Sequence, residues 1–364
     1  MESRYALGPF SQPDKALSTW GCYLDEGVWN LFPHRPSISQ HLPSITEAEW
    51  NGLDPLFRLG LKTAFQTIES TQNSLLRGTD QNRPAGSLNL QTFDPARCGV
   101  ILGSIALPIE SINDLCWDVL GSRYLSKVLE ASTGTKSPGP HGSADSQRWS
   151  EQNRYALSLP AAIIARELGW RGPAFTLDAA CASSIYAVKL AMNELRAGRA
   201  DVMLAGGLSR PDCQYTQIGF SQLKALSQGQ KCRPLDARAD GLVVGEGAGM
   251  FLLMRLQDAI AAGLEIHAVL VEAGLSNDRG GSLLSPRAEG QLRAMRAAYQ
   301  RAGWLPESVD LIECHATGTP VGDQVEIASL HELWRQAGYR SSRAVLGAVK
   351  SNVGHLLTGA GALL

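Results

Sequence analysis

The chain has 364 residues, of which 44% are hydrophobic and 19% are charged, and its net charge is −2. This globular balance suits two domain-sized units or one large α/β unit, and it argues against a general attraction to nucleic acid. The seven cysteines include no Cys-x-x-Cys pair, which argues against a disulfide framework and a zinc site. The sequence has no long apolar run and no apolar segment after Met1, which argues against a membrane span and a signal peptide. These features favour a cytoplasmic location.

The first half of the chain predicts alternating helices and strands. Residues 1 to about 50 show no clear period, whereas apolar residues between Leu53 and Glu69 recur at helical spacing. Segments 79–97 and 131–150 are polar and contain Gly and Pro, which predicts loops. The other predictions here are a strand at Cys98–Ser104, a helix at Asn153–Glu167, a strand at Phe175–Leu177, a helix from Ile185 to Gly198 and a buried strand at Asp201–Gly207.

The second half continues this alternation. Segment 240–254 is typical of an apolar hairpin interrupted by glycines. Helices are predicted at Asp258–Gly263 and Glu289–Gly303, and strands at His267–Gly274, Asp310–Cys314 and Val345–Val349. The short connections favour an α/β sheet buried on both faces.

Cys181 lies where the Phe175–Leu177 strand turns into the next helix, among small residues. Small neighbours allow a sharp turn that projects one reactive side chain, and the helix N-terminus favours a thiolate, so we expect a lowered thiol pKa. A buried structural cysteine is the alternative for this stretch taken alone.

Two later stretches favour a reactive Cys181 over a structural one. Glu313–Glu326 contains His315 in the run His-Ala-Thr-Gly-Thr, and Lys350–His355 contains a second histidine after a glycine. One Cys, two His in glycine-containing motifs and a Lys, in this order and with the glycine-rich segment 236–249 between them, resemble the β-ketoacyl synthases (ketosynthases) of fatty-acid and polyketide assembly. The His motifs are closer in wording to those of multidomain polyketide and polyunsaturated fatty-acid synthases.

The resemblance implies roles for these residues. Cys181 would accept an acyl group from a thioester, and the imidazole N–H groups of His315 and His355 would stabilise the enolate formed when a malonyl unit loses carbon dioxide. Lys350 would pair with Glu326 and tune the two histidines. An exposed Lys and Glu are the alternative for that pair.

Three further residues match substrate-binding positions of the family. Thr317 and Thr319 would hydrogen-bond a pantetheine arm, although Thr-Gly-Thr alone is only a turn signal. Phe220 would line the acyl pocket, and an ordinary core Phe is nearly as good an interpretation.

The resemblance also implies the thiolase-like fold, an α/β fold with two similar halves stacked as five layers, αβαβα. We expect residues 1–255 to form the half that carries Cys181 and residues 256–364 to form the half that carries both histidines. A glycine-rich Gly-Phe-Gly-Gly segment that family members carry near their C-terminus is not found before Leu364, so we expect the second half to be incomplete.

The predicted function is that of a β-ketoacyl-acyl-carrier-protein synthase. It needs no cofactor beyond the phosphopantetheine of its carrier, and it implies an acyl carrier protein as partner and a homodimer. Two alternatives remain. A non-catalytic chain-length-factor-like partner is disfavoured by the presence of Cys181, and a thiolase-type enzyme acting on acyl-CoA is disfavoured by the His-Lys-His set.

Overall fold

The computed structural model describes residues 21–24, 45–75, 93–105, 122–134, 159–210, 214–229, 231–280, 286–339 and 343–363. The predicted loops 79–97 and 131–150 and the start of the Asn153–Glu167 helix fall largely outside these ranges. Every helix within them is too short or too polar to cross a lipid bilayer.

The first half is built on a four-stranded sheet. Its strands are β2 (Cys98–Gly103), β3 (Ala174–Leu177), β4 (Val202–Ser209) and β6 (Gly247–Met254), in the spatial order β3-β2-β4-β6. β2 is parallel to both β3 and β4, and β6 runs antiparallel to β4. Every residue of β2 and β4 is buried, as the predicted double cover requires.

Alternate residues of β2 point to opposite faces of this sheet. Val100 and Leu102 pack in a core with α3 (Pro55–Leu75) and α6 (Leu159–Glu167), whereas Ile101 packs with α7 (Ser183–Arg196). The two faces therefore follow directly from the period of two along a strand. The helix predicted at Leu53–Glu69 is α3, and it is preceded by α2 (Glu47–Gly52), which begins with a capping box at Thr46.

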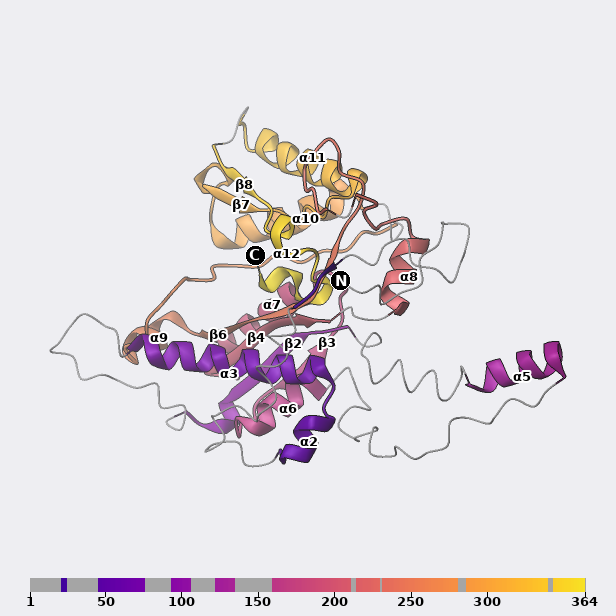
Figure 1. Ribbon diagram of the computed structural model, residues 1–364. Helices are drawn as coiled ribbons and strands as arrows, with labels where there is room; N and C mark the ends of the chain where they lie inside the picture. The colour runs from indigo at the N-terminus through magenta and orange to yellow at the C-terminus, as the bar shows by residue number, and fades with distance from the viewer. Residues whose placement is uncertain are drawn as a thin grey trace.

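The second half is smaller. Its parallel strands β7 (Leu311–Glu313) and β8 (Val345–Gly347) are covered by α10 (Ala288–Ala302) and α11 (Pro320–Gln336), which share a core around Leu292, Leu333 and Trp334. In Figure 1 α3 and α6 lie on the lower side of the four-stranded sheet, α7 and the C-terminal turns lie on its upper side, and β7, β8, α10 and α11 lie above these turns.

Further elements, most of them short, complete the described chain. They are β1 (Gly21–Cys22), η3 (Pro95–Arg97), α5 (Ser122–Thr133), α8 (Gln214–Gln222), β5 (Val244–Gly245), α9 (Leu256–Ala261), η7 (Pro306–Ser308), α12 (Lys350–Val353) and η8 (Leu357–Ala362).

Two sequence predictions are wrong. Residues 240–254 form no hairpin, because β5 pairs with β1 while β6 pairs with the distant β4. Residues 267–274 form no strand, because among the described residues no strand lies beside them to complete a ladder. The predicted helices at 258–263 and 289–303 and the strands at 310–314 and 345–349 are present with slightly different ends.

Candidate active site

A tight turn between β3 and α7 presents Cys181. Ala180 has a positive φ of 50°, a conformation that a residue with a Cβ rarely adopts. Two side chains hold it there: Asp178 Oδ1 accepts from the Ala180 amide at 2.9 Å, and Ser183 Oγ donates to the Ala180 carbonyl at 2.6 Å while accepting from the Ala179 amide at 2.8 Å. The turn is thus pinned on both sides of the cysteine, as the elbow pattern predicts.

Glycines at the ends of the central strands let the start of α7 come down onto the sheet. A Cβ on Gly103 of β2 would lie 2.6 Å from Ser183, and a Cβ on Gly207 of β4 would lie 2.8 Å from Ser184 Cβ. Both contacts are far shorter than real Cβ contacts. These two glycines therefore fix the height of Cys181 above the sheet.

His355 reaches the thiol directly. Its Nε2 lies 3.0 Å from Cys181 Sγ, and the residue is 1% exposed. The backbone on which it stands is tied to the first half, because the His355 amide donates to the Val243 carbonyl at 2.7 Å and the Gly245 amide donates to the His355 carbonyl at 2.9 Å. Nδ1 of His355 has no hydrogen-bond partner among the described residues, so no such contact fixes the tautomer.

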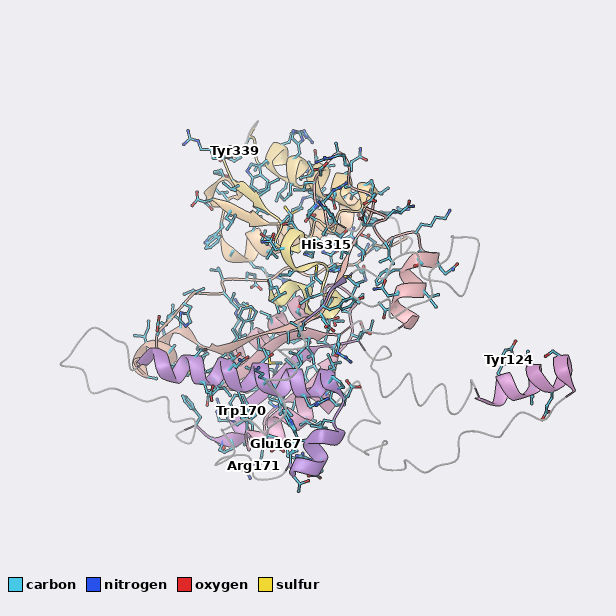
Figure 2. All side chains as sticks on the ribbon, viewed as in Figure 1. Tyr124, Glu167, Trp170, Arg171, His315 and Tyr339 are labelled. Atoms are coloured by element: carbon cyan, nitrogen blue, oxygen red, sulfur yellow. The ribbon has the colours of Figure 1, made fainter. Side chains whose placement is uncertain are left out.

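His315 follows β7 and approaches from the second half, at the level where the two halves meet in Figure 2. Its ring centroid lies 5.3 Å from that of His355, with the ring planes at 87°. Glu326 on α11 holds the backbone there, since its two carboxylate oxygens accept from the amides of His315 at 2.6 Å and of Ala316 at 2.7 Å. One thiol and two imidazoles from separate parts of the chain are thus gathered in one place.

Lys350 is 2% exposed, and its Nζ has no hydrogen-bond partner among the described residues. The expected direct pairing of Lys350 with Glu326 is not seen, because the carboxylate of Glu326 accepts hydrogen bonds from backbone amides instead. It still acts on Lys350 through its charge, as does Glu313, whose Oε1 accepts from the Val349 amide at 2.6 Å. Glu313 has no role in the sequence prediction, although its place at a strand end is a usable signal.

Burial dominates the electrostatics of this group. It raises the pKa of the Cys181 thiol to about 11, against the smaller lowering effects of Lys350 and the local backbone amide. The lowered thiol pKa predicted from the helix N-terminus is therefore wrong for the resting site, because the loss of hydration of the thiolate outweighs the backbone amide and the charge of Lys350.

The histidines shift in the opposite sense, toward the neutral form. Burial, then the charges of His315 and Lys350, lower the pKa of His355 well below its usual range. Loss of hydration and Lys350 lower the pKa of His315 to about 4. Part of the His315 surface is exposed, however, so of the two histidines it is His315 whose pKa is lowered less. Burial also lowers the pKa of Lys350, and the carboxylates of Glu326 and Glu313 oppose that decrease. At neutral pH both imidazoles are uncharged and each carries one N–H.

Thr317 and Thr319 lie in the loop that follows His315, with their hydroxyl oxygens 2.9 Å apart. Asp323 in the first turn of α11 accepts from the Gly318 amide at 3.2 Å and the Leu235 amide at 2.8 Å, so it anchors this loop against residues 233–241. Phe220 on α8 is partly buried and packs against Leu226, Leu242 and Val244. This packing accounts for Phe220 as a core residue, and its place in an acyl pocket stays a prediction.

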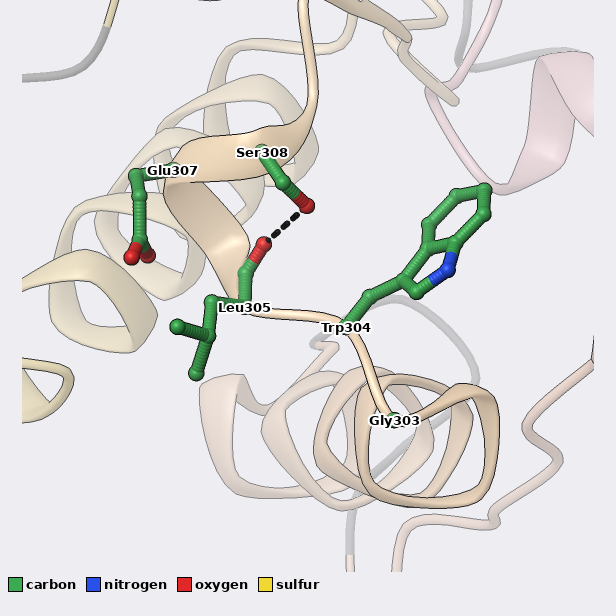
Figure 3. Close-up of a pocket in the computed structure, with 5 residues that line it drawn as sticks. All are labelled: Gly303, Trp304, Leu305, Glu307 and Ser308. Atoms are coloured by element: carbon green, nitrogen blue, oxygen red, sulfur yellow. Dashed lines mark hydrogen bonds between the residues drawn. The ribbon is translucent and has the colours of Figure 1, made fainter.

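A surface hollow of about 410 Å³ shares no residue with this group. It is lined by Gly303, Trp304, Leu305, Glu307 and Ser308 (Figure 3). The chemistry-bearing side chains therefore lie elsewhere, between the two halves. The described residues contain no group of three or more His, Cys, Asp or Glu suited to a metal ion.

Comparison with known families agrees with this arrangement. The model of the beta-ketoacyl synthase N-terminal domain matches residues 25–259, and that of the C-terminal domain matches residues 267–364. The chain belongs to the beta-ketoacyl synthase family. Cys181 lies in the stretch matched by the first model, and His315 and His355 lie in that matched by the second.

Relatives of this ketosynthase-family chain are found among large synthases. It is 34% identical over 352 residues to a mycocerosic acid synthase-like polyketide synthase of Mycolicibacterium smegmatis, covering 96% of this chain and 14% of the relative. It is 32% identical over 280 residues to a polyunsaturated fatty acid synthase of a Thraustochytrium species, covering 74% of this chain and 13% of the relative. The chain thus spans about a seventh of the length of these proteins.

Solved structures show the same fold. The structure described as PfaC keto synthase–chain length factor superposes with a TM-score of 0.80 at 33% identity, covering 100% of this chain and 36% of that one. The chain therefore has the thiolase-like fold that the sequence predicts.

Proposed function

We propose that this chain carries the carbon–carbon bond-forming step of a polyketide or fatty-acid synthase. Cys181 takes an acyl group from a thioester, and His315 and His355 stabilise the enolate formed as a malonyl thioester loses carbon dioxide. The enolate carbon then attacks the acyl group on Cys181. The observation that carries the proposal is the 3.0 Å contact between Cys181 Sγ and His355 Nε2, with the ring of His315 5.3 Å from that of His355.

In the first step, His355 Nε2 takes the thiol proton as Cys181 Sγ attacks the thioester carbonyl. A base is needed because the thiol pKa of about 11 leaves little thiolate at neutral pH. The departing pantetheine thiolate then takes this proton from the His355 imidazolium, so the step ends with an acyl-Cys181 thioester and a neutral His355.

In the second step the two imidazoles act as hydrogen-bond donors. Because both pKa values are lowered, each ring is neutral and offers one N–H to the oxygen of the malonyl thioester carbonyl as carbon dioxide leaves. The electron pair of the broken carbon–carboxylate bond forms the new bond to the acyl carbonyl carbon, and Cys181 Sγ leaves as a thiolate that takes a proton from water. His355 needs Nε2 unprotonated in the first step and Nε2–H in the second, and both tautomers are accessible because no partner in the described part of the chain fixes a proton on Nδ1.

The two alternative functions fit less well. A chain-length-factor-like role has no use for a cysteine held beside a histidine. A thiolase-type mechanism needs a second cysteine as base, and the neighbour of His315, Cys314, is 1% exposed with its Sγ 3.9 Å from the Ile312 carbonyl oxygen. Cys314 therefore packs in the strand region and offers no base.

The acyl and malonyl groups are proposed to arrive on an acyl carrier protein, whose pantetheine arm would pass Thr317 and Thr319. We also propose a homodimer through β3. This strand forms one edge of the four-stranded sheet, and its Phe175 is 37% exposed. An edge strand with an apolar side chain tends to be paired or covered.

Release of labelled carbon dioxide from malonyl-pantetheine tests the proposal. The wild-type chain should release it, and both His315→Ala and His355→Ala should release it about 100- to 1,000-fold more slowly, the usual cost of losing one oxyanion donor. Release by either variant at the wild-type rate would rule out the paired-donor mechanism.

A further inference from the structure

A buried ion pair joins α7, the helix that follows Cys181, to the chain of the second half. Lys189 on the inner face of α7 is 8% exposed and contacts Glu272 Oε1, and the Glu272 side chain is 7% exposed. Arg196 Nη1 at the end of the same helix binds the other carboxylate oxygen at 2.7 Å. Glu272 lies in the extended stretch 264–278, which connects α9 to the elements around α10.

The carboxylate of Glu272 is well satisfied. The Ala273 amide donates to Oε1 at 2.9 Å, and Arg196 Nη2 binds the neighbouring Val271 carbonyl at 2.6 Å. Burial by itself raises the pKa of Glu272, but the hydrogen bonds from Lys189, Ala273 and Arg196 outweigh it and hold the pKa at about 2. The group is therefore charged at neutral pH, and loss of one partner leaves an uncompensated buried charge.

Close packing continues from Glu272 toward α10. A Cβ on Gly274 would lie 1.9 Å from the Ala294 carbonyl oxygen, so the stretch and the helix are in tight backbone contact. Arg293 of α10 donates from Nε to Ser276 Oγ at 3.2 Å and also binds the Asn277 carbonyl, and it pairs with Glu289 on its own helix. These bonds engage Arg293 within the second half.

The same path ends at His315 and not at His355. Helices α10 and α11 share a core, and Glu326 of α11 holds the backbone of His315. His355 is instead bonded to Val243 and Gly245 of the first half, and Thr358 after it donates to the Leu208 carbonyl at 2.7 Å. The two histidines therefore depend on different supports.

We propose that Glu272, held by Lys189 and Arg196, is a positioning residue that sets the distance between Cys181 and His315. The proposal rests on the function proposed above. We call the ion pairs of Glu272 with Lys189 and Arg196 the clamp. Loss of the clamp should impair the step that needs both histidines, while the contact between Cys181 and His355 persists.

The test compares Glu272→Gln with Glu194→Gln. Glu194 also lies on α7 and pairs with Arg199, but this pair stays within the first half, which makes it a matched control. Decarboxylation of malonyl-pantetheine should fall about 100-fold in Glu272→Gln, because a displacement of about 1 Å in a reacting group costs that much. Alkylation of Cys181 by iodoacetamide should stay at the rate of the control.

A second arm measures proximity without any reaction of the enzyme. In a His315→Cys background, a short bifunctional thiol reagent should join the introduced thiol to Cys181, as mapped by peptide mass spectrometry. The yield should fall when Glu272→Gln is added and not when Glu194→Gln is added. The cross-linking yield tests the clamp even if the wild-type chain releases no carbon dioxide. Absence of carbon dioxide release would contradict the proposed function and not the positioning role.

Arg196→Gln is a milder variant that should fold even if Glu272→Gln does not, because the Arg196 side chain is 47% exposed and the contact of Glu272 with Lys189 remains. It should show a smaller fall in decarboxylation with unchanged alkylation. Equal losses of decarboxylation and alkylation in Glu272→Gln and Arg196→Gln, or a cross-linking yield equal to that of Glu194→Gln, would overturn the positioning role.

Discussion

Replacement of His355 and His315 one at a time should separate two roles that the sequence alone does not distinguish. Of these two described histidines, His355 is the one within hydrogen-bond distance of the thiol, with Nε2 at 3.0 Å from Cys181 Sγ. Removal of His355 should therefore impair both acyl transfer to Cys181 and decarboxylation, whereas removal of His315 should impair decarboxylation only.

The size of the effect follows from the thiol pKa. With a pKa of about 11, the thiolate fraction at pH 7 is about one in 10⁴, since each pKa unit is a factor of ten. A positioned general base contributes about 10²- to 10⁴-fold. Acylation in His355→Ala should thus slow by about 10²-fold or more, and acylation in His315→Ala should stay close to the wild-type rate.

The assay is the rate at which Cys181 gains mass from an acyl-pantetheine thioester, followed by mass spectrometry of the tryptic peptide. Thermal unfolding of each variant checks that the fold is intact, because His355 is buried and leaves a cavity. Acylation of His355→Ala at the wild-type rate, or equal loss in both variants, would refute the assignment of His355 as the base.

Other predictions test the surroundings of the site. The rate of alkylation of Cys181 should rise steadily from pH 7 to 10, because burial raises the pKa of its thiol to about 11, and a plateau near neutral pH would indicate a thiolate–imidazolium pair. Gly103→Ala should destabilise the chain by about 1–3 kcal/mol in denaturant unfolding, because its Cβ would lie 2.6 Å from Ser183, and unchanged stability would show that α7 can move away at no cost. The side chains of Arg97 and Arg255 lower the pKa of Asp201 against the opposing effect of burial. Asp201 therefore contributes stability that is present above its unfolded pKa and is lost as pH falls through its folded pKa. Asp201→Asn should thus make the unfolding temperature less sensitive to acid, and an unchanged acid sensitivity would contradict this contribution.

The sequence predicts the location of the candidate site because its residues follow strands. Cys181, His315 and Lys350 come shortly after the ends of β3, β7 and β8, and strand ends are where α/β folds collect polar groups. The small residues around Cys181 also predict the turn. These features are local, so a single sequence contains them.

The errors concern features that depend on distant partners. The glycine-broken segment 240–254 looks like a hairpin, yet β6 pairs with β4, about forty residues earlier, and β5 with β1. The thiol pKa depends on burial beneath His355 and its neighbours, which a helix N-terminus alone does not reveal. The carboxylate of Glu326 serves the amides of His315 and Ala316, a choice that only the loop geometry decides.

A single-turnover condensation tests the central claim most directly. The chain would be loaded with an acyl group, mixed with malonyl-acyl carrier protein, and both proteins weighed by mass spectrometry over time. The account predicts that the acyl mass leaves the Cys181 peptide as a β-ketoacyl mass appears on the carrier, with one carbon dioxide released for each transfer. An acyl group that stays on Cys181 while carbon dioxide is released, or one that appears on another cysteine, would contradict it.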